Sequence, residues 1–206
     1  MKMFRTLVFP VILLTSCATT QSGNVPNLVS KNQVEQMAEV SWHDTITRIG
    51  LSENIATKTR FESVANKVIS ASSLSEEDWD VKLLAGQNPL IFSLPGNRLA
   101  GRGIETMSDD RIASMAAFGI ASLELRHAQQ MASRQVLGKT LLSTTSLLGA
   151  GKNSTRNKLL LSRPAPPTVE MRKEATERAE EIIITAGFTP DFLISTNPLS
   201  LGGPIN

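Results

Sequence analysis

The stretch SDDRIASMAAFGIASLELRHAQQMAS, residues 108–133, decides the fold because it predicts a central helix. Ser108 can accept a backbone N–H at the N-cap, and the two aspartates after it place negative charge where the helix dipole favours it. Across residues 113–123 almost every side chain is apolar or small, so we expect this helix to be buried on nearly all sides. Polar residues return from Glu124 onward, and there the same helix should emerge into solvent.

Three further helices and two strands are predicted around this helix. The spacing of apolar residues favours helices at Lys31–Ile49, 57–70 and 169–186, with Gly50 and Gly187 ending the first and the last. Short strands are predicted at 80–84 and 90–94, around a turn at 86–89. Hydrophobic residues make up 41% of the chain, which is globular composition. We therefore expect an α+β fold that is mostly helical, with a small β-hairpin or sheet beside the central helix.

The N-terminus predicts export and lipid attachment. A short positive region precedes an apolar run at residues 7–14, which is too short to span a bilayer and is typical of a signal peptide. The tetrapeptide LTSC that ends at Cys17 resembles the bacterial lipobox, in which the cysteine is lipidated and becomes the new N-terminus. Because Ala18 rather than aspartate follows, the resemblance implies the outer membrane, with the domain on the periplasmic face. The alternative is an ordinary secretory signal with an incidental cysteine.

The predicted organisation is a signal peptide at 1–16, a flexible tether at 17–28, one domain at 29–195 and a C-terminal tail at 196–206. The tether is predicted from its Thr, Gln, Ser, Gly, Asn and Pro residues. Removing the signal peptide takes Lys2 and Arg5 from the 21 basic residues, which leaves 19 against 19 acidic ones. The mature chain is formally neutral, so we expect no nucleic-acid partner.

Several landmarks resemble one family of zinc enzymes. Leu94-Pro95-Gly96 precedes the central helix, which contains the pair Ile120-Ala121 and closes on Arg126-His127, and the segments TVEMRKEAT (168–176) and AGFTP (186–190) come later. These motifs resemble the HExxH metallopeptidases related to the CAAX prenyl protease type 1 and to periplasmic metallopeptidases. The resemblance spans about residues 31–193 and implies a zincin domain whose central helix carries the zinc site. The alternative is a buried core helix that never bound metal.

The resemblance also implies that the zinc chemistry is missing. We align the chain with the family's motifs and call this alignment the family frame. In it Phe118 and Ser122 stand at the positions of the two zinc histidines, Gly119 at that of the catalytic glutamate, and Arg172 at that of the third zinc ligand. A phenyl ring has no lone pair for zinc, glycine carries no base, and a guanidinium repels a cation. We therefore expect no catalytic residue, no metal site and no cofactor.

The expected function is binding rather than catalysis. Such a pseudoenzyme would be held at the membrane by the lipid on Cys17, and its partners would be envelope or outer-membrane proteins, because active relatives act on misassembled outer-membrane proteins. In those relatives an extended substrate adds to the strand near the L-P-G turn, so this chain could still hold a partner's strand. These features point to a role in envelope protein quality control.

Two catalytic alternatives remain. The first is an active metalloendopeptidase with a relocated zinc site, for which His43, His127 and scattered carboxylates are the possible ligands. His127 lies nine residues beyond Phe118, so on one continuous helix it would point to the opposite face. The second is a serine hydrolase that uses Ser122, which we disfavour because no G-x-S-x-G motif surrounds this serine.

Overall fold

The computed structural model of the chain describes residues 27–147 and 166–192, with side chains described outside 138–147. The elements in chain order are α1 Lys31–Ile49, α2 Ile55–Ser70, β1 Asp80–Leu83, β2 Leu90–Leu94, β3 Arg98–Arg102, α3 Asp109–Glu124, α4 His127–Leu147 and α6 Val169–Thr185. The prediction of a mostly helical α+β fold with a small sheet is confirmed. No helix in the described part of the chain is long and apolar enough to cross a membrane. The predicted signal peptide, Cys17, nearly all of the tether and the tail lie outside the described residues.

The sheet has three strands in the order β1-β3-β2, with β1 parallel and β2 antiparallel to β3. β3 was not predicted, because its sequence, RLAGR, combines glycine and two arginines and carries little strand signal. The hairpin is therefore not at 86–89 but between β2 and β3. There Gly96 (φ 81°) and Asn97 (φ 57°) take left-handed conformations, which glycine and asparagine tolerate best.

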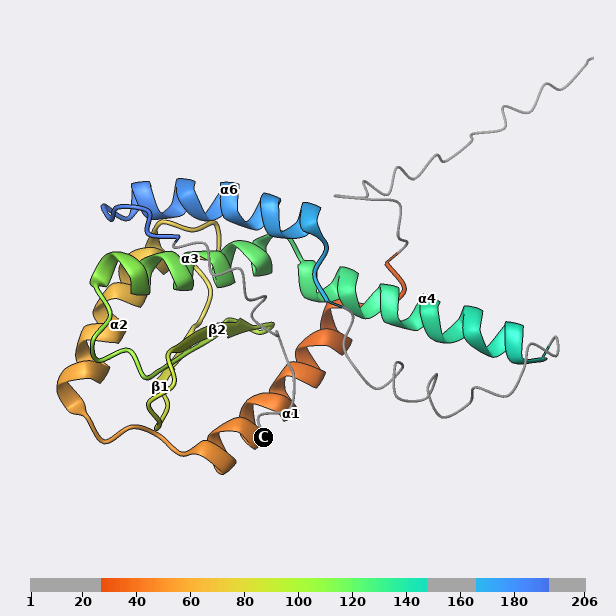
Figure 1. Ribbon diagram of the computed structural model, residues 1–206, viewed down its shortest axis with the longest axis horizontal. Helices are drawn as coiled ribbons and strands as arrows, with labels where there is room; N and C mark the ends of the chain where they lie inside the picture. Colours follow the sequence, from red (N-terminus) through yellow and green to blue (C-terminus); the bar gives the residue numbers. More distant parts are fainter. Residues whose placement is uncertain (1–26, 148–165, 193–206) are drawn as a thin grey trace, which may run out of the picture.

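The two faces of the sheet are covered by different helices (Figure 1). On one face α3 packs against β2, and α2 and α6 pack against α3. This side holds the main core, which includes Phe61, Leu99 and Ile120. On the other face α1 buries Trp42 against Leu84 and Ala100. The central position predicted for the helix at 109–124 is thus confirmed.

The prediction of one helix through residue 133 is wrong. α3 ends at Glu124, Arg126 adopts φ 55°, and α4 begins at His127. The Arg126 N–H donates to the Leu123 carbonyl at 3.0 Å, which closes the turn between the helices. Neither glycine nor proline marks this break, so no local signal was available. The break also turns His127, Gln130 and Ser133 inward, where the sequence predicted exposure to solvent.

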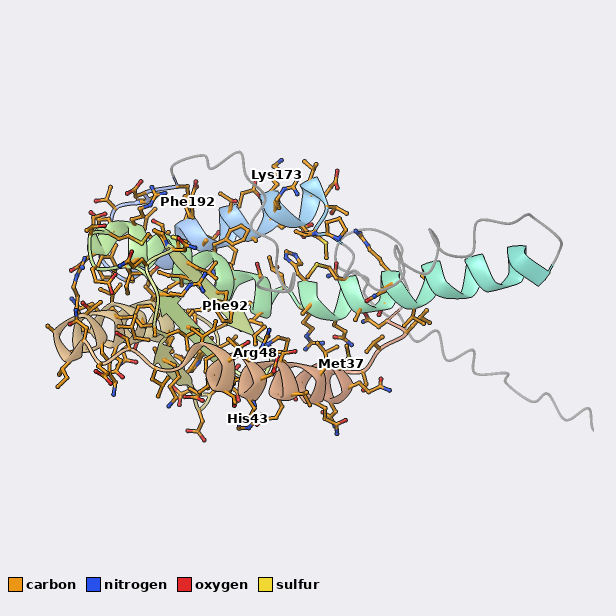
Figure 2. All side chains as sticks on the ribbon, turned by 60° about the horizontal axis from the view of Figure 1, so that its bottom comes forward. Met37, His43, Arg48, Phe92, Lys173 and Phe192 are labelled. Atoms are coloured by element: carbon orange, nitrogen blue, oxygen red, sulfur yellow. The ribbon has the colours of Figure 1, made fainter. Side chains whose placement is uncertain are left out.

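The flanking helices follow their sequence signals closely. α1 has the predicted bounds, and Ser30 and Gln33 form a capping box at its start. Thr168 caps α6 as expected, and that helix ends one residue before the predicted end, at Thr185. α4 contacts α1 and α3 and then extends away from the layered body in both views (Figures 1 and 2).

Candidate functional site

The closest approach between helix and sheet lies at Gly119, where the family frame expects the catalytic glutamate. A Cβ atom at this position would lie 2.8 Å from Ser93 Oγ and 3.1 Å from Ser93 Cβ on β2. Separations this short require the neighbouring atoms to shift. Gly119 is therefore a packing residue, and a glutamate side chain has no space here in this arrangement.

The two positions that flank Gly119 in the frame are also occupied by structural contacts. Phe118 is half-buried and packs against the main core. The Ser122 hydroxyl donates to the Phe118 carbonyl of the same helix at 2.9 Å. A serine nucleophile needs a base beside it, and the hydroxyl of Ser122 is directed to its own backbone instead.

Arg172 does not lie beside these positions. Its Nη1 donates to the Pro167 carbonyl at 3.1 Å, at the start of α6, and the side chain is exposed. α6 runs antiparallel to α3, since Arg178 contacts Glu124 near the end of α3 and Thr189 contacts Asp110 near its start. Arg172 lies six residues before Arg178, or about 9 Å along the helix. It therefore lies past the end of α3, and the structure does not bring the predicted third-ligand position to the other two.

A half-buried ion pair joins the end of α3 to α6 instead. Arg178 Nε donates to Glu124 Oε2 at 2.6 Å, and the Ser73 N–H donates to Glu124 Oε1 at 2.6 Å. Burial raises the pKa of Glu124, but the hydrogen bonds from Arg178 and Ser73 outweigh it and hold the pKa below its usual value. Because every Glu124 oxygen is engaged, this pair is structural rather than poised for proton transfer.

His127 and Glu174 form the one described contact between a buried histidine and a carboxylate. His127 is 3% exposed, and its Nε2 lies 3.4 Å from Glu174 Oε2. Burial lowers the pKa of His127 more than Glu174 raises it, so the ring is neutral near pH 7. Sequence reasoning missed this pair because it assumed one continuous helix through His127.

The two histidines proposed for a relocated zinc site are not brought together. His43 lies on the outer side of α1, where its Nε2 is 2.7 Å from Glu39 Oε1 (Figure 2). A catalytic zinc needs three protein ligands. Among the side chains described in residues 27–137 and 166–192, no three His, Cys, Asp or Glu gather as a metal site would require.

β2 lies at the edge of the described sheet. The Leu84 N–H donates to the Gly101 carbonyl at 2.8 Å, so the backbone groups of Gly101 point toward β1. The backbone groups of Arg98, Ala100 and Arg102 therefore point toward β2. They pair there with Leu94, Phe92 and Leu90. The backbone groups of Ile91 and Ser93 therefore point away from β3, and among the described strands none pairs with them. The edge is unpaired but covered: Ile91 and Ser93 are 4% and 7% exposed, so a strand added here would have to displace the groups that cover it.

Comparison with known proteins gives no assignment: no protein-family model and no curated protein matches this chain. Two features of the site remain to support a function. One is the closed contact between Gly119 and Ser93. The other is the unpaired edge of β2, which includes Ser93 of that contact.

Proposed function

We propose that this protein is a bacterial outer-membrane lipoprotein, anchored through Cys17, whose periplasmic domain resembles a zinc metallopeptidase but binds its partner without cutting it. The proposal of an anchor depends on the LTSC tetrapeptide, and the proposal of lost catalysis on the central helix. Zincin ancestry belongs to this proposal as well, because it depends on the order of the sequence motifs.

The observation that carries the proposal is the contact between Gly119 and Ser93. In a HExxH enzyme the residue at this position must carry a carboxylate that reaches the zinc-bound water. Here even a Cβ atom would lie 2.8 Å from Ser93 Oγ. The neighbouring phenyl and hydroxyl groups are poor zinc ligands. The contact between helix and sheet thus occupies the place where the chemistry would occur.

The unpaired edge of β2 is the proposed binding surface, and binding there would displace the groups that cover Ile91 and Ser93. An extended segment from an envelope protein would pair with the backbone groups of Ile91 and Ser93. Main-chain hydrogen bonds of this kind give affinity without requiring one sequence, which suits recognition of misassembled outer-membrane proteins. The protein would then act in envelope quality control by holding such segments.

Backbone-methylated peptides test this binding mode. The probe is a ten-residue strand from an outer-membrane β-barrel, measured by fluorescence anisotropy with the mature protein. In an extended peptide the N–H groups of odd and even residues point to opposite edges of the strand. One derivative is N-methylated at odd residues, and the second is N-methylated at the same number of even residues. We expect one derivative to lose binding and the other to keep it, because only one set of N–H groups can face β2. Equal binding by both, or no binding of the parent peptide, would contradict the proposal.

The alternative, an active metalloendopeptidase with a relocated site, has one observation in its favour. His127 and Glu174 could supply two zinc ligands, although a third is not among the described residues. The alternative predicts stoichiometric zinc in the purified protein and its loss in His127→Gln. Zinc that resists dialysis and depends on His127 would favour this alternative over a binding protein.

A further inference from the structure

Charge is segregated along the chain although the mature protein is neutral overall. All 19 acidic residues lie outside the segment 125–169. The same segment carries seven of the basic residues, namely Arg126, Arg134, Lys139, Lys152, Arg156, Lys158 and Arg163. The first three lie in the described part, one just before α4 and two on it. α4 is thus a helix without acidic residues on an otherwise acidic body.

α4 also extends beyond the body formed by the sheet and the other helices. It has 21 residues, so it is about 31 Å long, and it extends away from the layers formed by the sheet and the other helices (Figure 1). Arg126, just before the helix, and Val136 on it are exposed, and Arg134 is half-buried. Arg134 also interacts electrostatically with Glu170 of α6, so its charge is partly balanced. Arg126 therefore contributes a full exposed charge and Arg134 less than one, and the sequence places Lys139 further along the same helix.

The chain reaches the domain from its N-terminus directly at α4. The N–H groups of Leu28 and Val29 donate to Ser133 Oγ at 3.0 and 3.3 Å, and Gln129 Nε2 donates to the Val29 carbonyl at 2.7 Å. Leu28 lies eleven positions after Cys17, and whatever its conformation this length of chain spans no more than about 40 Å. A lipid on Cys17 would keep the part of α4 around Ser133 close to that distance from the bilayer.

We infer that α4 docks on the anionic phospholipid surface of the membrane that holds the anchor. The orientation rests on the proposed function, because the anchor at Cys17 is part of it. Charge and position identify this surface as the docking partner of α4. Basic side chains attract anionic headgroups over a Debye length. The anchor keeps those headgroups at high local concentration. Docking would hold the layered body, and the edge of β2 with it, at a set orientation to the membrane.

Vesicle flotation of the unlipidated mature chain tests the docking separately from the anchor. The protein begins at residue 17 with Cys17→Ser and retains every described residue. Vesicles contain phosphatidylethanolamine with or without phosphatidylglycerol. We expect binding only with phosphatidylglycerol, weakening as salt rises. The triple variant R126Q/R134Q/K139Q should bind about 30-fold to 150-fold more weakly, since each basic residue near an anionic surface contributes about fivefold.

The matched control removes three basic residues from other helices. Arg48, Lys58 and Lys173 are exposed, form only surface ion pairs within their own helices, and change the net charge by the same amount when replaced by Gln. Lys173 lies on the outer side of α6 (Figure 2). The control should keep the wild-type affinity, and circular dichroism should show both variants folded.

Three results would overturn the inference: equal loss of binding in the two triple variants, equal binding to vesicles without phosphatidylglycerol, or no binding at low salt. Mass spectrometry of the N-terminal peptide tests lipidation of Cys17 independently. If the unlipidated chain docks but Cys17 of the native protein carries no lipid, the proposed anchor is wrong and the docking surface is supported. If Cys17 is lipidated but the α4 variant binds like wild type, the docking surface is wrong and the anchor is supported.

Discussion

Replacing Gly119 with alanine tests how closely α3 lies against β2. In an open helix this substitution stabilises a protein by about 1 kcal/mol, because glycine is the poorer helix former. Here the new Cβ would lie 2.8 Å from Ser93 Oγ and 3.1 Å from Ser93 Cβ. Overpacking of this kind costs about 1–3 kcal/mol. The net effect should therefore range from almost zero to a destabilisation of about 2 kcal/mol.

A double-mutant cycle with Ser93→Gly isolates the contact. This second substitution removes both close atoms and leaves Ser93 N, at 3.4 Å, as the nearest remaining neighbour of the new Cβ. In that background Gly119→Ala should stabilise the protein by about 1 kcal/mol. The coupling between the two positions should then be about 1–3 kcal/mol. Urea unfolding followed by circular dichroism measures each free energy.

The control on the same helix is Ser122→Ala. The hydroxyl of Ser122 donates only to the Phe118 carbonyl of its own helix, so its loss should change the free energy of unfolding by less than about 0.5 kcal/mol. If Gly119→Ala instead stabilises the protein equally in both Ser93 backgrounds, the helix and strand are further apart than described. The proposal that packing at position 119 leaves no room for a catalytic glutamate would then fail.

Three other substitutions test the polar contacts and the helix break. Glu124→Gln should lower the free energy of unfolding by about 2–3 kcal/mol at pH 7. Because the pKa of Glu124 is lowered in the fold, this stabilisation is present above its usual value of 4.5 and lost as pH falls through the folded value, so urea midpoints of variant and wild type should converge in acid. Burial lowers the pKa of His127 below 6.5, so the fold is stabilised while the ring is neutral and loses this contribution as pH falls below that value. His127→Asn should therefore make the Tm less dependent on pH in that range. Arg126→Gly should stabilise the protein by about 1 kcal/mol in urea titrations, because only glycine adopts φ 55° without strain.

The helices with complete local signals could be predicted from the sequence. α1 has a serine cap, a matched glutamine and a terminal glycine, and its bounds were predicted to the residue. α6 was predicted within one residue from Thr168 and the glycine after its end. The burial of α3 followed from its run of small and apolar residues.

The elements fixed by tertiary contacts could not be predicted. β3 forms because β1 and β2 pair with its two edges, not because RLAGR favours a strand. The break at Arg126 occurs at a non-glycine residue, and burial of His127 and Ser133 against other elements compensates for it. Since both depend on partners distant in sequence, local propensity carried no signal for them.

The candidate site was predicted in part. The sequence frame placed Phe118, Gly119 and Ser122 on one buried helix, and the structure supports this placement. It did not reveal that Ser93 packs against Gly119, since that contact joins a strand to a helix 26 positions away. The frame also placed Arg172 beside them, which the antiparallel course of α6 contradicts.

The central claim is that this domain binds without metal-dependent hydrolysis. The most direct test measures zinc content and casein cleavage on the same preparation of mature protein, with and without a chelator. The account predicts less than stoichiometric zinc after dialysis and no cleavage that the chelator abolishes. One zinc per chain together with chelator-sensitive cleavage would contradict it.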